Sequence, residues 1–267
     1  MNLYVFTHTL GRATRTTVSL CLGTASFFYI VLYGSSTFYG NSAPDIPWLR
    51  DPPRGMRAML GGTADFLHAA GWLSTGMSHP ITLALFTSGA LTVAVGGVAG
   101  EIERGTIEFV LTRPVTRRRY LTAIAAAALV VVTAVQLSGL LVTLLARQTV
   151  DGVDQLGVAQ VLRPFAGSWL LFAAISQVSL LVSATVSLRG RALALSAGFV
   201  VLSFFANFAA MMIDQLSGLR LASVFHYVQP ATLLNGHGLT DLAMPAAVGV
   251  VALAIALVLF GRRDIVR

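Results

Sequence analysis

Residues 120–146 read YLTAIAAAALVVVTAVQLSGLLVTLLA, a stretch without a single acidic or basic side chain. A helix needs about 20 apolar residues to cross a hydrocarbon core of ~30 Å. Lipid offers no hydrogen-bond partners, so a spanning segment of this kind must satisfy its backbone groups internally, as a helix does. The stretch therefore predicts a transmembrane helix.

Further apolar runs of similar length surround this one, at residues 16–38, 80–100, 165–188, 192–213 and 243–261. The first of them exceeds the apolar core of about 7–15 residues found in cleaved signal peptides, so we expect it to be retained. Across the chain, 55% of residues are hydrophobic and only 11% are charged, whereas soluble domains carry about 25% charge. We predict an all-α membrane protein with six transmembrane helices in one domain, residues 1–267.

The placement of arginine predicts how these helices are oriented, because cytoplasmic loops of membrane proteins carry an excess of basic residues. With both termini in the cytoplasm, the inner segments hold twelve of the 18 basic residues but only four of the 11 acidic ones. We therefore expect a multi-pass protein of the plasma or inner membrane with cytoplasmic termini. The net charge of +7 then reflects topology and contact with the lipid bilayer, and we expect no nucleic-acid partner.

Shorter elements are expected between and before the spans. The 3.6-residue periodicity of residues 1–14 predicts an interfacial helix lying along the inner leaflet. A helical stretch is expected near 53–60, ended by Gly61 and Gly62. Apolar pieces at 219–228 and 233–239 are too short to span and predict short outer helices before the last span.

Several kinds of chemistry are excluded by residue type. All basic residues are arginine, and without lysine neither a phosphate-binding P-loop nor a Schiff base can form. Cys21 is the only cysteine, so paired-cysteine zinc sites are excluded, and the histidines lack the spacing of metal ligands. We expect no catalytic residue, no metal and no cofactor bound by this chain.

The loop between the second and third predicted spans reads GEIERGTIEFVLTRPVTRRRY over residues 100–120. Thr106 follows the flexible Gly105 and is a good N-cap, and Glu108 suits the positive end of a helix dipole. Pro114 disfavours helical geometry in the residue before it. The pattern predicts a short helix over 105–112, with Thr116 capping the next span.

This segment resembles the cytoplasmic coupling segment of ABC-2 type permeases, the membrane subunits of ABC exporters. The closing residues 260–265 also resemble the C-terminal end of that family, and the six-span layout agrees with it. The resemblance rests on a glycine, glutamate and threonine pattern followed by a leucine, a proline and an arginine. It assigns contact with an ATP-binding subunit to Gly100, Glu101, Glu103, Arg104, Gly105, Thr106, Glu108, Leu111, Pro114 and Arg117.

The resemblance also implies a working complex. Such a permease has no ATPase activity of its own, and ATP and Mg would be bound by a separate ABC ATP-binding subunit present in two copies. A second permease, identical or homologous, would complete the complex, and ATP binding would tilt the spans to export or flip a substrate. Arg189 and Arg191 form a tight turn between the fourth and fifth spans, which is either a topological anchor or a second contact with the ATPase.

Polar and small residues inside the spans permit two interpretations each. Gln136, Gln177 and Asn207 either form interhelical hydrogen bonds or contact a substrate along the translocation pathway. Gly96 and Gly100 form a small-xxx-small pair, which favours a close approach of two helices over the alternative of a binding site.

Two other functions stay open at this point. An ion-coupled secondary carrier would normally need a buried acidic residue or histidine in a span, and none lies in the middle of the predicted spans. A membrane subunit that performs mechanical or assembly work without moving a small molecule would carry the same coupling segment.

Overall fold

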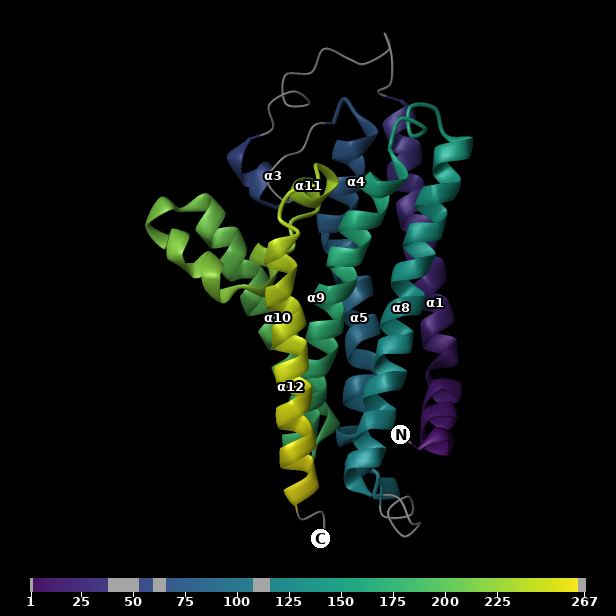
Figure 1. The fold of residues 1–267 in the computed structure, drawn as a ribbon, viewed down its shortest axis with the longest axis vertical. Helices are drawn as coiled ribbons and strands as arrows, with labels where there is room; N and C mark the ends of the chain where they lie inside the picture. Colours follow the sequence, from purple (N-terminus) through teal and green to yellow (C-terminus); the bar gives the residue numbers. More distant parts are fainter. Residues whose placement is uncertain (1, 38–52, 60–65, 108–115, 264–267) are drawn as a thin grey trace.

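The computed structural model describes residues 2–37, 53–59, 66–107 and 116–263, and within these ranges it contains helices and no strands. Five helices are long and apolar enough to cross a membrane and run lengthwise through the molecule (Figure 1). They are α1 (Leu3–Ser36), α8 (Arg117–Thr149), α9 (Val158–Thr185), α10 (Arg189–Met212) and α12 (Ala243–Arg262).

The predicted span at 80–100 differs from the others. Helix α5 (Pro80–Gly96) ends before residue 100, and α4 (Ala69–Ser78) precedes it at an angle of 50°. Pro80 occupies the first turn of α5, and His79 Nδ1 accepts a hydrogen bond from the Ile81 backbone N–H at 3.2 Å. Helix α5 thus covers residues 80–96 of the predicted span, and the described residues contain five candidate spans, or six if the bent pair counts as one, so the exact six-span arrangement is not confirmed.

The first residues also differ from the prediction, because they belong to α1 and do not form a separate interfacial helix. No proline interrupts the segment, and the Thr14 and Thr17 hydroxyl groups donate to carbonyl oxygens four residues earlier, which is compatible with an unbroken helix. Helix α9 likewise begins earlier than predicted and continues through Pro164.

Short helices occupy the remaining described segments. Helix α3 (Arg54–Met59) lies within the stretch predicted to be helical, and α6 (Ala99–Glu103) follows α5. Between α10 and α12 lie the 3₁₀ helices η2 (Asp214–Ala222), η3 (Val224–Tyr227) and η4 (Thr240–Leu242), together with α11 (Pro230–Leu234).

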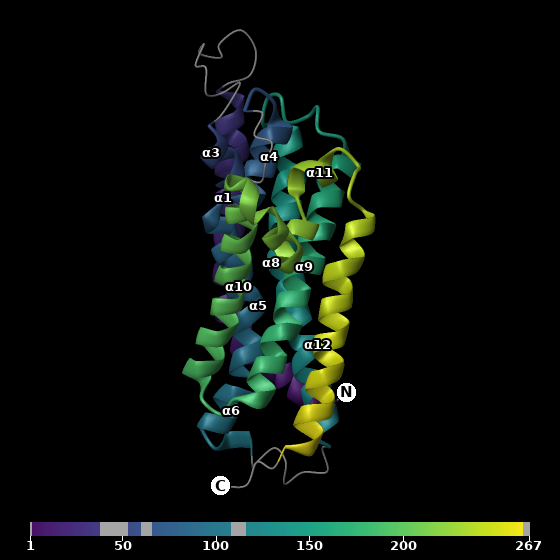
Figure 2. The same ribbon diagram turned by 90° about the vertical axis from the view of Figure 1, so that its left-hand side faces the viewer.

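The core forms around α8 and α9, with α1 packed along α8 and α12 packed along α9. Buried phenylalanine rings connect the elements: Phe28 of α1 contacts Phe86 of α5 and Phe165 of α9, with ring centroids 6.3 and 5.4 Å apart. Phe86 in turn contacts Phe172 of α9 at 5.2 Å. Figure 2 shows α10 and α12 on opposite flanks of this bundle.

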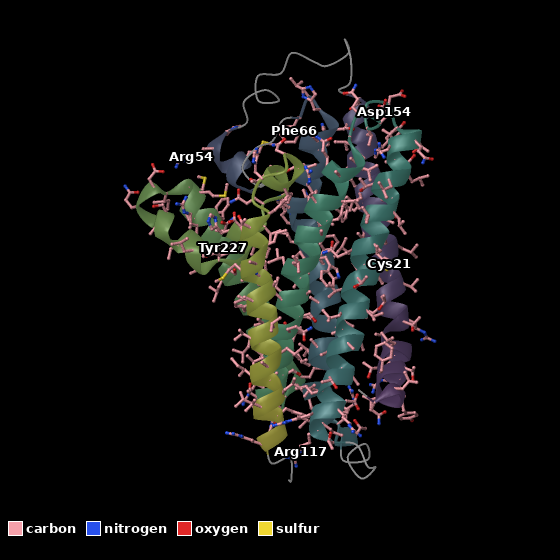
Figure 3. The ribbon with its side chains drawn as sticks, in the orientation of Figure 1. Cys21, Arg54, Phe66, Arg117, Asp154 and Tyr227 are labelled. Carbon is pink, nitrogen blue, oxygen red and sulfur yellow. The ribbon has the colours of Figure 1, made fainter. Side chains whose placement is uncertain are left out.

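Different segments of the chain lie at the two ends of the bundle. The start of α1 and the end of α12 lie at one end, which we call the terminal end (Figure 1), and Arg117 lies there too (Figure 3). Arg54 and Asp154 lie toward the opposite end. Helix η2 and the adjoining part of α10 project sideways from the bundle (Figure 1).

Candidate functional site

The candidate site lies at the terminal end, where the chain leaves α5 and enters α6. Gly97, the residue directly after α5, packs too closely against its surroundings to carry a side chain. A Cβ atom on Gly97 would lie 2.8 Å from Ile124 Cγ2 and 2.9 Å from the Val93 carbonyl oxygen. Tyr120 of α8 donates its hydroxyl hydrogen to the Gly97 carbonyl oxygen at 2.5 Å. The α5–α6 junction is thus fixed against α8.

Helix α9 holds the same junction through one serine. The Ala99 backbone N–H donates to Ser183 Oγ at 2.9 Å, and the Ser183 hydroxyl donates to the Val95 carbonyl oxygen at 3.3 Å. Ser183 is fully buried. It therefore replaces the helical hydrogen bonds that are lost where α5 ends.

Glu101 is the polar centre of the site. Its carboxylate accepts a hydrogen bond from Arg12 of α1 at 2.5 Å and further hydrogen bonds from Arg104 and from the Thr106 hydroxyl. Burial raises the pKa of Glu101, but the hydrogen bonds from Thr106 and Arg104 and the charges of Arg104 and Arg12 outweigh it, so the net pKa lies below its ordinary value. Glu101 is therefore held as a carboxylate that joins α1 to the segment after α6.

Glu103 makes the connection to α10. Its Oε2 accepts a hydrogen bond from the Arg189 backbone N–H at 2.6 Å, at the first residue of that helix. A carboxylate at a helix N-terminus satisfies a free N–H group and interacts favourably with the helix dipole. Together, Glu101 and Glu103 connect the start of the predicted coupling segment to α1 and α10.

The segment then turns sharply at Gly105, whose φ of +70° is a conformation that side chains disfavour. Thr106 and Ile107 are helical, and Ile107 is buried. Thr106 was expected to cap this helix, but it lies within it and turns its hydroxyl toward Glu101. Glu108, Leu111 and Pro114, and with them most of the predicted helix 105–112, lie outside the described residues.

The next described residue is Thr116, which caps α8 as predicted. Its side chain accepts a hydrogen bond from the Arg119 backbone N–H at 3.3 Å. Arg117 donates to the Arg263 carbonyl oxygen. The Arg263 side chain donates to the Ala184 carbonyl oxygen at 2.8 Å and to Ser187 Oγ at 2.5 Å, and its burial lowers its pKa. The end of α12 thereby joins the start of α8 to the end of α9.

The small-xxx-small pair is not the point of close approach. Among the described residues, no atom outside the surrounding helix backbone lies within 4 Å of a Cβ built on Gly96, and the three atoms nearest to one built on Gly100 belong to arginine side chains at ordinary distances. Gly97, between them, is the residue that needs to be glycine. Sequence reasoning also missed Arg12, Ser183 and Arg263, because each contacts the site from a distant part of the chain.

The amides inside the spans behave differently from one another. Gln136 of α8 donates to Ser168 of α9 at 3.1 Å, which is an interhelical hydrogen bond. Gln177 is buried, and neither polar atom of its amide has a hydrogen-bond partner within the described ranges. Asn207 lines a small cavity of about 50 Å³ between α4, α5, α9, α10, η3 and α11. None of these three amides belongs to the set of residues that contact the α5–α6 junction.

Comparison with known proteins fits this geometry. The family model for ABC-2 family transporter proteins matches residues 58–265, which include every described helix from α4 onward and the whole α5–α6 junction. No curated protein sequence matches the chain. The apolar helices make the chain a multi-pass membrane protein, and because the family match extends over most of its length, the chain belongs to the ABC-2 family of transporter proteins.

Proposed function

We propose that this chain is the permease subunit of an ATP-driven exporter and works as a dimer with two ABC ATP-binding subunits. In this proposal the terminal end faces the cytoplasm, and segment 100–120 receives the movement of the ATP-binding subunit. ATP and Mg would be bound by that subunit, since the chain has no lysine for a P-loop.

The observation that carries the proposal is the set of contacts around the α5–α6 junction. Glu101 bonds to α1, Glu103 to α10, Tyr120 connects the junction to α8, and Ser183 connects it to α9. A force applied to the segment after Gly105 would therefore reach four long helices at once. Packed helices and hydrogen-bonded networks with discrete arrangements are the usual carriers of such coupling.

The surface around this junction supports a protein contact. Glu103 and Arg104 are exposed beside the buried Ile107, and Arg191 is exposed at the start of α10. We retain Arg191 as the second contact with the ATP-binding subunit. Arg189, the other residue proposed for this contact, is exposed as well and also lines a cavity that Glu101 borders.

Partner identity is tested by purifying the tagged full-length chain from the membranes of its own host. We expect a P-loop ATPase to co-purify and the complex to hydrolyse Mg-ATP. Recovery of the chain without any nucleotide-binding protein would contradict the proposal. Activity that follows a proton gradient instead of ATP would favour an ion-coupled carrier.

Coupling is tested without knowing the substrate, by measuring distances between spin labels on α1 and α10 near the end opposite the termini. Cys21, the only cysteine, is replaced by alanine in the background used for labelling. We expect Mg-ATP to change this distance in the complex, and Glu101→Gln to reduce the change while ATP hydrolysis continues. The matched control is Asp214→Asn, which removes an exposed carboxylate paired with Arg54. Equal distance changes in both variants would remove Glu101 from the coupling role.

A further inference from the structure

A cavity of about 210 Å³ opens at the terminal end between α1, α5, α6, α8 and α10. Its lining is mixed, with Thr9 and Thr16 of α1 and Thr92 of α5 supplying hydroxyl groups next to apolar walls. The neighbouring junction described above accounts for only one side of the cavity.

The charged groups in the cavity have one predominant sign. The guanidinium groups of Arg12, Arg104 and Arg189 share the lining with a single carboxylate, Glu101, which leaves an excess of two positive charges. Arg12 and Arg104 are already bonded to Glu101. An anion entering the cavity would meet arginines held in place by that carboxylate.

Arg189 supplies the unoccupied donors. Its backbone N–H donates to Glu103, but within the part of the chain that the structure describes its guanidinium makes no hydrogen bond or ion pair. A guanidinium group presents a planar fork of N–H donors that matches two oxygens of a phosphate group. The donor groups of the cavity therefore suit an anionic group such as a phosphate.

The surroundings of the cavity indicate where that phosphate comes from. Leu3 and Tyr4 of α1 are 67% and 58% exposed, and Leu193 of α10, about one turn after Arg189, is 45% exposed. In a membrane protein, exposed apolar side chains of this kind face acyl chains or the interface. We propose that the cavity binds the phosphate headgroup of an anionic phospholipid, with the acyl chains lying against α1 and α10.

This inference needs only that the protein resides in a membrane and does not depend on the exporter function. Native mass spectrometry of the full-length chain in detergent tests it, using equal amounts of phosphatidylglycerol and phosphatidylcholine with identical acyl chains. We expect preferential binding of phosphatidylglycerol. Arg189→Gln should weaken that binding about tenfold, the loss expected for one charge-assisted contact.

Arg262→Gln is the matched control, because Arg262 is an exposed arginine at the same end that does not line the cavity. We expect it to bind phosphatidylglycerol like the unchanged protein, and Arg189→Lys to bind with intermediate strength because it keeps the charge. Equal binding of the two lipids, or equal weakening by the Arg189 and Arg262 variants, would overturn the proposal.

Inorganic phosphate distinguishes a lipid from a soluble ligand. Competition by millimolar phosphate that disappears in Arg189→Gln, without any preference for phosphatidylglycerol, would assign the cavity to a soluble phosphate ester and overturn the lipid assignment. Retention of phosphatidylglycerol in the presence of phosphate would support it.

Discussion

Two ion pairs with the same separation lie in different regions of this protein. Arg12 and Glu101 at the terminal end are 2.5 Å apart, as are Arg54 and Asp214 near the projecting η2 helix. The Glu101 side chain is 13% exposed and the Asp214 side chain 82% exposed. Distance alone therefore does not distinguish them, whereas burial and additional partners do.

The surroundings explain what each pair can contribute. Glu101 accepts hydrogen bonds from two further side chains, and the α5–α6 junction next to it is packed at Gly97 and Tyr120. Asp214 begins a helix in which no residue is buried. Exposed pairs contribute about 0–1 kcal/mol because water and salt screen them. We conclude that the first pair belongs to a tightly connected region and the second to a loosely attached one.

The largest expected effect comes from disturbing the packing beneath Glu101. Gly97→Ala should lower the free energy of unfolding by about 2–3 kcal/mol, because the added Cβ would lie less than 3.0 Å from two atoms, one of them a backbone oxygen. Thermal unfolding in detergent measures this as a lower Tm.

The neighbouring glycine is the control for that substitution. Gly96→Ala adds a Cβ that, among the described residues, meets no atom outside the surrounding helix backbone within 4 Å, and at the end of a helix alanine is favoured over glycine by up to about 1 kcal/mol. We expect an unchanged or slightly higher Tm. Similar losses in both variants would show that the packing at Gly97 is not special.

The next effect should come from the buried carboxylate itself. Glu101→Gln removes the charge that Arg12 and Arg104 share, and we expect a loss of about 1–2 kcal/mol, typical of hydrogen bonds to charged groups. Arg12→Gln should lose less, because Arg104 and Thr106 still satisfy Glu101. A larger loss in Arg12→Gln would place the important contact on α1.

A smaller effect is expected from pH. The folded pKa of Glu101 lies below its ordinary value, so its contribution is complete above the ordinary glutamate pKa of about 4.3. It is lost as pH falls through the lower folded pKa. The difference in Tm between the unchanged protein and Glu101→Gln should therefore be constant above the ordinary glutamate pKa of about 4.3 and shrink as the pH falls below it. A difference that stayed constant below this pKa as well would mean that Glu101 is not held as a carboxylate.

The smallest effect belongs to the exposed pair. Asp214→Asn should change the free energy of unfolding by less than about 0.5 kcal/mol, because the Asp214 carboxylate lies in water and Arg54 still donates to the Met211 carbonyl oxygen. Added salt should shift the Tm of the variant and of the unchanged protein by the same amount. A loss as large as that of Glu101→Gln would remove the distinction between the two regions.

Sequence patterns predicted the long helices because their length and apolar composition are local properties. The exceptions also have local causes. Helix α4 was not recognised as part of a bent span, since it has 10 residues and includes Gly71, Ser74 and Gly76. Helix α9 begins at Val158, earlier than the apolar run that predicted it, and it contains Pro164, a residue that usually ends or kinks a helix.

The candidate site was predictable only in part. The pattern of glycine, glutamate and threonine marked the segment, and Thr116 was correctly expected to cap α8. The partners were not predictable, because Arg12 and Glu101 are 89 residues apart and meet only when α1 packs beside the junction. Arginines in short loops also satisfy the positive-inside rule, so their sequence context does not reveal a specific contact.

The contacts of Arg263 have a consequence for how the protein is made. The last carbonyl groups of α9 have no partner in their own helix, and the Ala184 carbonyl oxygen is satisfied by a guanidinium that lies 79 residues further along the chain. Arg117, at the start of α8, donates to the backbone of that same late residue. These contacts can therefore form only after the segment that carries Arg263 has been synthesised, so this end of the bundle closes later than the packing of α8 against α9.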